Sequence, residues 1–282
     1  MISWFRSIGF AISSSHQFGE TPYNPWGTTL AKHMLFDKIR GKLGLSACRF
    51  LAVSAAPISQ ETLDFFSSLN LEIHDVLGQS EGTAPLCFNT DTNQEWKMYT
   101  SGRVMKGVQV KTDPNTNEVL FKGRIVMMGY MKQPVETAAT IDDDGWLHTG
   151  DLACRTPDGY FRITGRLKDM IIRGGENIYP KEIEEFIYTH PKVKDVQVIG
   201  VPDEQYGEEI MACVILKEGE TMTEAEMKEF INAHMARHKV PRYIDFVDSF
   251  PMNVAGKILK YKMREDAVKK LGLQKADKVV TA

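Results

Sequence analysis

The chain has 282 residues, of which 43% are hydrophobic and 25% are charged, and its formal net charge is −3. This is the composition of a globular protein long enough for two domains with a substantial core. It excludes a basic nucleic-acid-binding surface, because Lys and Arg are interspersed with Asp and Glu. No CxxC pair is present, so we expect buried thiols rather than disulfides or a zinc site at Cys48, Cys87, Cys154 and Cys213.

Residues 1–15 are mildly apolar, carry their one charged side chain at Arg6 and are interrupted by Gly9. A signal peptide would be poorly formed here, and the pattern favours a helix of a domain whose upstream part is missing. No run of about 18 apolar residues occurs in the sequence, so no transmembrane helix is expected.

The first half of the chain alternates helical and strand patterns, which predicts a parallel sheet. Apolar residues at helical spacing in 28–43 predict a helix that ends at Gly44, and Ser59 is placed to cap a second helix. Two short apolar strands are each followed by a loop of small or polar residues, namely 48–53 with 54–57 and 71–77 with 78–82. Because ligands bind at the carboxyl ends of parallel strands, both loops are candidate binding sites.

The pattern changes at residue 103 to short strands separated by turns, which predicts a small antiparallel sheet or distorted barrel that continues through 143–166. Lys168-Asp169 marks a boundary, and a compact α+β unit is predicted after it. Its expected elements are strand 169–173, helix 180–189, strands 193–200 and 210–216, helix 223–236, strand 244–247 and a final helix of about 260–271. The fold class is therefore α/β: a partial parallel sheet with a small antiparallel β subdomain, followed by a compact α+β domain.

Residues 143–184 concentrate side chains suited to binding. Asp151 follows Gly150 at an expected turn, where a carboxylate can accept two vicinal hydroxyls. Arg166 offers a planar fork of donors, and Gly174-Gly175 lets another group approach the backbone closely. Pro180 begins the helix that follows.

Two further places could carry chemistry. Ser80-Glu81 sets a hydroxyl beside a carboxylate at a strand end, where they can bind a phosphate oxygen and magnesium, although the same pair would also serve as a helix N-cap. Lys257 follows Gly256 in a polar loop, and a lysine in that position is ordinarily just a solvated loop residue.

Together these segments resemble the AMP-forming acyl-CoA synthetases, the adenylate-forming enzymes that include luciferase and coumarate ligases. The segment 143–184 carries the resemblance most densely, and the resemblance covers about residues 30–272. Residues 30–150 are more similar to long-chain, bubblegum-type synthetases, and residues 165–272 to medium-chain acyl-CoA synthetases.

The resemblance implies a nucleotide site for ATP and AMP. In it, Ser80 contacts the AMP phosphate and Glu81 holds Mg²⁺ as metal ligand and catalytic residue, in the loop that begins at Leu77, where the family usually has Tyr. Asp151 and Arg166 bind the ribose, and Tyr160 and Ile163 flank the nucleotide. Ser54-Ala55-Ala56-Pro57 resembles the adenine-pocket turn, so Ala55 and Ala56 are also cofactor-binding candidates, with an ordinary β–α turn as the equal alternative.

The resemblance also implies roles for residues in the carboxy-terminal half of the chain. Lys257 is implied as the catalytic lysine that neutralises charge on the carboxylate and α-phosphate as pyrophosphate leaves. Lys168 and Asp169 align with a hinge, with a plain charged turn as the alternative. Gly174 and Gly175 would line the path of the thiol of coenzyme A.

The family's Ser/Thr/Gly-rich phosphate loop ending in Pro-Lys-Gly is absent, and 26–32 only superficially resembles it. Residues 1–167 are therefore expected to be the carboxy-terminal part of the large AMP-binding domain, without the half that carries the phosphate loop. Residues 168–282 are expected to be the mobile carboxy-terminal domain.

The function implied is that of a medium- or long-chain fatty acid–CoA ligase, here in a truncated form, with fatty acid, ATP and coenzyme A as its partners. A catalytically impaired nucleotide- or CoA-binding fragment, an incomplete gene model without a stable fold and an aryl- or amino-acid-adenylating ligase remain alternatives. The expected location is intracellular, either cytoplasmic or mitochondrial, with peripheral membrane association left open. Acyl length and oligomeric state are not readable from the sequence.

Overall fold

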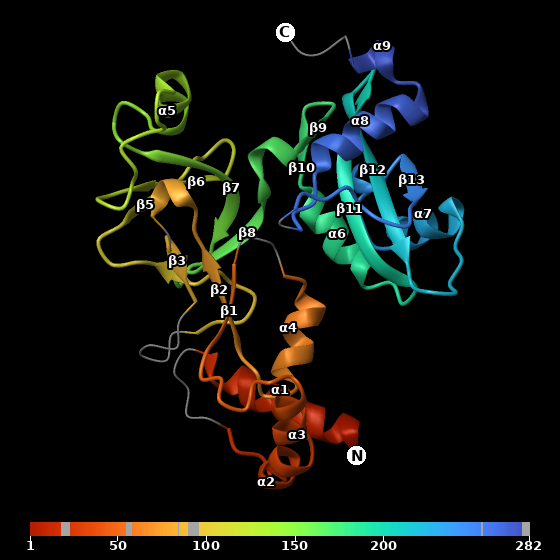
Figure 1. The fold of residues 1–282 in the computed structure, drawn as a ribbon. Helices are drawn as coiled ribbons and strands as arrows, with labels where there is room; N and C mark the ends of the chain where they lie inside the picture. Colours follow the sequence, from red (N-terminus) through yellow and green to blue (C-terminus); the bar gives the residue numbers. More distant parts are fainter. Residues whose placement is uncertain (18–22, 55–57, 84, 90–95, 255, 278–282) are drawn as a thin grey trace. The chain divides into compact units, whose positions relative to one another are not determined.

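The computed structural model describes residues 1–17, 23–54, 58–83, 85–89, 96–254 and 256–277 (Figure 1). The chain divides into two compact units, residues 1–163 and residues 164–282, which are described separately. Within the described residues, none of the helices has both the length and the apolar character needed to span a bilayer.

The first unit begins with helices and a parallel strand pair. Its elements are α1 (Ile2–Ser15), α2 (Thr28–Ala31), a π-helical stretch η2 (Lys32–Phe36), α3 (Asp37–Lys42), β1 (Leu51–Ser54), α4 (Gln60–Ser67) and β2 (Ile73–Leu77). Helix α1 packs against α2 and η2, with Phe5 and Ile8 in one buried cluster with Ala31 and Phe36. The Ser59 side chain accepts a hydrogen bond from the Thr62 backbone N–H at 3.2 Å, so the predicted cap of α4 is confirmed.

Strands β1 and β2 run parallel, with Leu51 opposite Ile73 and Ser54 opposite Val76. This confirms the predicted parallel pair, although β1 begins three residues later than expected and includes Ser54. The sheet continues in the order β1-β2-β3-β4 with antiparallel β3 (Cys87–Phe88) and β4 (Arg103–Val104).

A second sheet of the first unit has the order β5-β6-β7-β8. Its strands are β5 (Gln109–Thr112), β6 (Glu118–Lys122), β7 (Leu147–Arg155) and β8 (Phe161–Arg166). The predicted antiparallel pattern is confirmed, while helix α5 (Pro134–Thr140) was not predicted. One buried cluster joins both sheets, with Leu77 from β2 packed among Phe121 from β6 and Phe161 from β8.

The second unit is a sheet covered on both faces. Its elements are η4 (Leu167–Asp169), β9 (Ile171–Arg173), β10 (Glu176–Ile178), α6 (Pro180–Tyr188), β11 (Val193–Asp203), β12 (Gly207–Leu216), α7 (Glu224–Asn232), η5 (Arg237–Lys239), β13 (Tyr243–Phe246), α8 (Lys260–Leu271) and α9 (Gln274–Asp277). The strand order is β10-β9-β12-β11, and β13 pairs with β12.

Strand β12 shows why both faces are covered. Ile210, Ala212 and Val214 belong to the cluster that includes residues of α6 and α7. The alternate residues Met211 and Cys213 belong to the cluster that includes Met263 and Ala267 of α8. Since side chains alternate between the faces of a strand, this apolar run is buried on both sides. The α+β architecture predicted for this part is confirmed, and the β9–β10 hairpin adds a strand that was not predicted.

The cysteines follow the prediction only in part. Cys87 and Cys213 are buried, and burial raises the pKa of each thiol to about 12. Cys48 and Cys154 are exposed, which corrects the expectation of four buried thiols, because both lie outside the packed strand faces. All four are free thiols.

We expect Gly102→Ala to destabilise the first unit strongly. A Cβ at Gly102 would lie 2.1 Å from the carbonyl carbon and oxygen of Phe88, and its φ is +81°. Gly107 has a similar φ of +84° but nothing within 4 Å of its Cβ position, so Gly107→Ala is the matched control. In urea unfolding, the free energy of unfolding should fall by about 1–2 kcal/mol for the control. It should fall by roughly 3 kcal/mol or more for Gly102→Ala. Equal losses would show that the contact with Phe88 relaxes freely.

Candidate functional site

A polar turn follows the carboxyl end of β2. The 3₁₀ turn η3 (Ser80–Gly82) begins three residues after Leu77, with Ser80 exposed and Glu81 half-buried. Leu77 itself is buried in the cluster that joins the two sheets. The sequence placed a hydroxyl and a carboxylate at a strand end, and the structure shows them on a turn rather than at the start of a long helix.

The segment 125–130 fixes this turn. The Met127 N–H donates to the Glu81 carbonyl oxygen at 2.8 Å, and the Thr83 hydroxyl donates to the Ile125 carbonyl oxygen at 2.7 Å. The Tyr130 hydroxyl donates to Glu81 Oε1 at 2.6 Å. Sequence reasoning missed Tyr130, because nothing in local spacing connects it to a turn 49 residues earlier.

The contact between Tyr130 and Glu81 changes the pKa of the tyrosine. A phenol that donates to a carboxylate resists ionisation, so this hydrogen bond is the main cause that raises the pKa of Tyr130 above its usual value. The second carboxylate oxygen of Glu81 makes no hydrogen bond or ion pair with the described residues. Tyr130 therefore holds one oxygen of Glu81 in place, and the other oxygen could bind a cation.

Asp151 lies on a β-bulge. The pairing of β6 with β7 passes from Glu118↔Leu152 to Leu120↔His148, so residues 149–151 face Val119 alone. The sequence predicted a turn at Gly150-Asp151, and the structure instead shows these residues inside β7, where extra residues bend the strand. Thr149 stabilises the bulge: its hydroxyl donates to the Val119 carbonyl oxygen at 2.6 Å and accepts from the Asp151 N–H at 3.0 Å.

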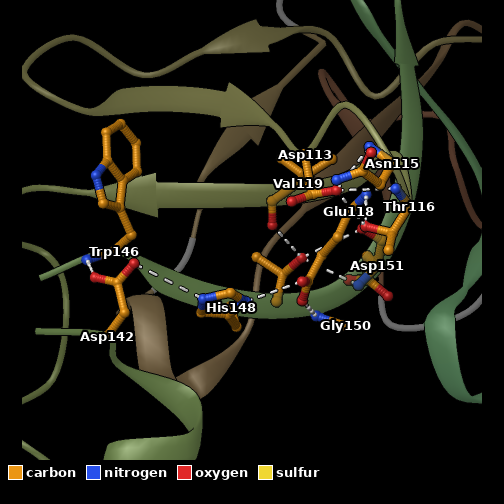
Figure 2. A network of polar contacts seen from close by, with 11 residues as sticks. Asp113, Asn115, Thr116, Glu118, Val119, Asp142, Trp146, His148, Gly150 and Asp151 are labelled. Carbon is orange, nitrogen blue, oxygen red and sulfur yellow. Dashed lines mark hydrogen bonds and ion pairs between the residues drawn. The ribbon is translucent and has the colours of Figure 1, made fainter. Parts of the chain in front are cut away.

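The buried carboxylate of Glu118 supports the same bulge (Figure 2). Its Oε1 accepts the Gly150 N–H at 2.8 Å, and its Oε2 lies 2.9 Å from His148 Nδ1. Since a carboxylate accepts, His148 Nδ1 carries the proton, and His148 Nε2 lies 3.9 Å from Asp142 Oδ2. Glu118 is only 6% exposed. Sequence reasoning missed it, although an acidic residue at the head of the apolar run 119–121 is a usable signal.

The β5–β6 hairpin beside Glu118 is closed by an Asx turn, also visible in Figure 2. Asp113 Oδ1 accepts the backbone N–H groups of Asn115 at 2.8 Å and Thr116 at 2.9 Å. These donors lower the pKa of Asp113. The turn fixes the entry of β6 and with it the position of Glu118.

Tyr160 and Ile163 lie in the core of the first unit. Tyr160 is 1% exposed, with Arg103 Cζ 4.6 Å and Lys97 Nζ 5.3 Å from its ring centroid. Ile163 packs against the cluster that joins the two sheets. Tyr160 is thus buried in this structure, and its role and that of Ile163 beside a nucleotide stay predictions. Ala55 and Ala56 lie outside the described residues.

In the second unit, Arg166 is the last residue of β8 and immediately precedes the 3₁₀ turn η4, which contains Lys168 and Asp169. Gly174 and Gly175 form the two-residue turn between β9 and β10, with Arg173 paired to Glu176. Their φ values of +58° and +86° match a type I′ hairpin turn, which side chains tolerate poorly. The Gly174 N–H donates to the Tyr206 carbonyl oxygen at 2.9 Å, which attaches the turn to the β11–β12 hairpin.

Lys257 lies in a closed loop. Met252 and Ile258 form an isolated β-bridge at its base. Across the loop, the Asn253 N–H donates to the Lys257 carbonyl oxygen at 3.0 Å, and the Lys257 N–H donates to Asn253 Oδ1 at 2.9 Å. The Lys257 side chain is exposed. The two hydrogen bonds therefore hold the backbone of Lys257 against Asn253.

Comparisons with known proteins agree with this arrangement. The family model of the AMP-binding enzyme C-terminal domain matches residues 182–257. The putative acyl-CoA synthetase YngI of Bacillus subtilis strain 168 is 47% identical over 208 residues, which cover 70% of this chain and 38% of that protein. The mitochondrial medium-chain acyl-CoA ligase ACSF2 of Bos taurus is 40% identical over 242 residues, covering 81% of this chain and 39% of that protein.

The crystal structure of ATP-bound MatB from Rhodopseudomonas palustris is similar with a TM-score of 0.74 and 30% identity, covering 84% of this chain and 49% of that one. The chain belongs to the AMP-forming acyl-CoA synthetase family. It spans less than two fifths of the length of the two curated relatives.

As a member of this family, the chain carries its predicted site residues in two groups. The first unit holds Ser80 and Glu81 on one turn and Asp151 on a bulge. The second unit holds Arg166, the Gly174-Gly175 turn and the Lys257 loop. The matched C-terminal domain model ends at Lys257. The roles of these residues as an acyl-CoA synthetase site remain predictions.

The contact between Glu81 and Tyr130 can be measured directly. We expect Glu81→Gln to lower the pH at which one tyrosine ionises, because the phenol would no longer donate to a charged carboxylate. Ultraviolet titration of tyrosinate would record the shift, and Tyr130→Phe would remove it. Glu61→Gln, an exposed change in the first turn of α4, is the control. Titration curves that coincide for Glu81→Gln and the unchanged chain would contradict the contact.

Proposed function

We propose that this chain is part of a fatty acid–CoA ligase that forms an acyl-adenylate from ATP and then transfers the acyl group to coenzyme A. The observation that carries the proposal is the Asp151 bulge, whose Gly150 N–H is held by the buried Glu118 and whose Asp151 N–H is held by Thr149. A carboxylate on a fixed backbone is suited to accept the two hydroxyls of a ribose. The names of the relatives, which are acyl-CoA synthetases and ligases, support the reaction class.

Nucleotide binding would use Asp151, Arg166 and Ser80. Asp151 would accept the 2′- and 3′-hydroxyls, with Arg166 donating to the same sugar. The exposed hydroxyl of Ser80 would donate to the α-phosphate. The ATP-bound state of the similar MatB structure supports ATP as the nucleotide.

The residues fit a magnesium ion carried in with the nucleotide. Mg²⁺ is commonly held by one or two carboxylates together with substrate phosphates, and Glu81 offers one carboxylate oxygen while Tyr130 orients the other. When bound, the ion supplies positive charge that neutralises the phosphate oxygens. The Tyr130 hydrogen bond limits the rotation of Glu81 and so selects the oxygen that faces the phosphates.

Adenylation would proceed by attack of the fatty acid carboxylate on the α-phosphorus, with the bond to pyrophosphate breaking in line. Lys257 would place its ammonium against the negative charge that builds on the attacking and leaving oxygens, which needs no proton transfer from the lysine. In the second step the thiol of coenzyme A would attack the acyl carbonyl carbon. The thiol would lose its proton, AMP would leave, and acyl-CoA would form.

The second unit would serve the two steps in turn. We propose that the η4 residues Lys168 and Asp169 absorb the backbone change between an orientation that uses the Lys257 loop and one that uses the Gly174-Gly175 turn. A bare glycine turn would leave room for the pantetheine arm of coenzyme A. Residues 1–167 and 168–282 would then be the carboxy-terminal part of the AMP-binding domain and the mobile domain.

The names of the relatives favour medium-chain fatty acids and, for ACSF2, a mitochondrial location. We propose an intracellular location for this chain on that basis. A second candidate function is weak binding of a nucleotide or coenzyme A without turnover, which needs Asp151 and Ser80 to contact the ligand but no bond to form or break.

The first test is formation of acyl-CoA. The purified chain would be mixed with Mg-ATP, coenzyme A and fatty acids of medium and long chain, and the products measured by mass spectrometry. Acyl-CoA in the full mixture but not without ATP would support the ligase. Its absence, combined with a melting temperature that rises with ATP, would favour the binding function. A melting temperature independent of ATP would contradict both.

Lys257→Ala separates the two half-reactions. We expect it to lower acyl-AMP formation by about 10²–10³-fold, as loss of a transition-state charge contact does. Thioester formation from supplied acyl-AMP should be unchanged. Lys262→Ala, an exposed lysine in the first turn of α8, is the control and should alter neither step. Equal loss of both half-reactions in Lys257→Ala would exclude the proposed role.

A further inference from the structure

The Gly174-Gly175 turn lies at the tip of a small hairpin at the edge of the second unit's sheet. Strands β9 and β10 have three residues each, and the strand order β10-β9-β12-β11 places β10 at the edge. A two-stranded hairpin is only marginally stable by itself in water. The position of its turn is therefore set by the contacts that the hairpin makes with the neighbouring strand, β12.

Side chains make much of this attachment. Among the described residues, the register of β9 with β12 contains one residue pair, in which Arg173 lies opposite Gly207. The next backbone donor of β9, the Ile172 N–H, is bound by a side chain instead, because Glu208 Oε2 accepts it at 2.9 Å. Since regular backbone pairing between the two strands is so short, the side chains beside the turn decide where the turn lies.

Arg173, the residue directly before the turn, makes the strongest of these side-chain contacts. Its Nε donates to Glu209 Oε2 and its Nη2 donates to Glu209 Oε1, both at 2.8 Å. The carboxylate is buried in β12. A bidentate contact of this kind fixes the plane of the guanidinium as well as its distance from the carboxylate. The last residue of β9 is therefore held to β12 in one geometry.

The ring of Tyr206 connects this ion pair to the turn. Arg173 Cζ lies 4.5 Å from the ring centroid, a favourable position for a cation over an aromatic ring. A Cβ at Gly174 would lie 3.1 Å from Tyr206 Cδ1, so the ring packs closely against Gly174. The Cβ position of Gly175 has no atom within 4 Å. One glycine of the turn is thus packed against the unit, and the other is open.

We propose that Arg173 is a positioning residue for the thioester step, which acts by fixing the glycine turn through Glu209 and Tyr206. The inference rests on the proposed function, in which this turn lines the path of the coenzyme A thiol. Misplacement of a reacting group by about 1 Å can cost about 10²-fold in rate. A loosened turn should therefore slow attack of the thiol on the acyl carbonyl carbon. Adenylation, which would use the Lys257 loop, should not change.

The test removes the ion pair without leaving a buried charge. Arg173→Met alone would leave the Glu209 carboxylate buried and unpaired, so the main variant is Arg173→Met with Glu209→Met, because apolar side chains of similar volume commonly replace a buried pair without loss of the fold. Arg173→Lys is the conservative variant, since lysine keeps the charge but not the planar fork. Lys270→Met with Asp245→Asn is the control and removes an ion pair between α8 and β13 instead.

The first measurement is hydrogen exchange of the Gly174 amide in the full chain, because this N–H donates to the Tyr206 carbonyl oxygen. We expect exchange about tenfold or more faster in the double variant, as loss of a hydrogen bond to a charged group predicts. Arg173→Lys should give an intermediate rate, and amides of the β11–β12 ladder should keep theirs. A Gly174 exchange rate equal to that of the control would overturn the proposal, whether or not the chain is a ligase.

The second measurement is thioester formation from supplied acyl-AMP and coenzyme A. In the double variant we expect kcat to fall about tenfold or more, with the KM for acyl-AMP and the rate of acyl-AMP formation from ATP unchanged. An equal fall in both half-reactions would indicate general damage to the unit and overturn the proposal, as would a thioester rate equal to that of the control. If the unchanged chain forms no thioester, the proposed ligase function fails, and the role of Arg173 in that step fails with it.

Discussion

The buried carboxylate of Glu118 is the contact on which the first unit's site depends. A carboxylate that is 6% exposed is unfavourable unless both oxygens find donors. Here one oxygen accepts the Gly150 N–H and the other faces His148 Nδ1. The desolvation cost is offset only if the β7 bulge keeps its shape, so the same interaction that stabilises Glu118 also fixes the backbone that carries Asp151. Removal of either partner would leave a buried polar group unsatisfied.

The turn after β2 shows the same principle in a second place. A strand end in a parallel pair gives a ligand-binding position but does not orient the side chains found there. The orientation comes from the segment that follows β6 in the second sheet, through Ile125, Met127 and Tyr130. Because the two sheets share one buried cluster, β2 and the antiparallel strands are held as a single body. The parallel strand pair thus sets the position of the turn after β2, and the segment after β6 of the antiparallel sheet orients its side chains.

The contacts of Glu118 and those of the turn after β2 also show what the sequence can and cannot predict. The parallel pair, the Ser59 cap and the helix beginning at Pro180 depend on neighbouring residues, and all three were predictable from local patterns. The contacts of Tyr130 with Glu81 and of Glu118 with Gly150 join residues 49 and 32 positions apart, so no local pattern shows them.

Strand register and burial also depend on residues that are distant in the sequence. The turn predicted at Asp151 was a strand bulge, because a bulge is created by the register of a partner strand and not by the residues on it. Cys48 and Cys154 were expected to be buried because thiols usually are, but whether a position faces the core is again set by packing partners. The family resemblance supplied the candidate residues, and the structure supplied the contacts that orient them.

In the second unit, an ion pair ties the start of α8, which follows the Lys257 loop, to the sheet. Glu184 of α6 accepts the Val198 N–H of β11 at 2.8 Å and the Lys260 ammonium at 2.6 Å, and Lys260 also donates to the Val198 carbonyl oxygen at 3.0 Å. Lys260 begins α8, only three residues after Lys257. A partly buried pair with additional backbone partners restrains its residues more than an exposed pair does.

The Gly174-Gly175 turn is attached to the same sheet at another point. The neighbouring Arg173 makes a bidentate contact with the buried Glu209, with both nitrogen–oxygen distances at 2.8 Å. The start of α8 and the residue beside the glycine turn are thus attached to the same sheet by separate charge contacts. The reorientation proposed for this unit would therefore carry both segments together, with η4 as the proposed site of the backbone change.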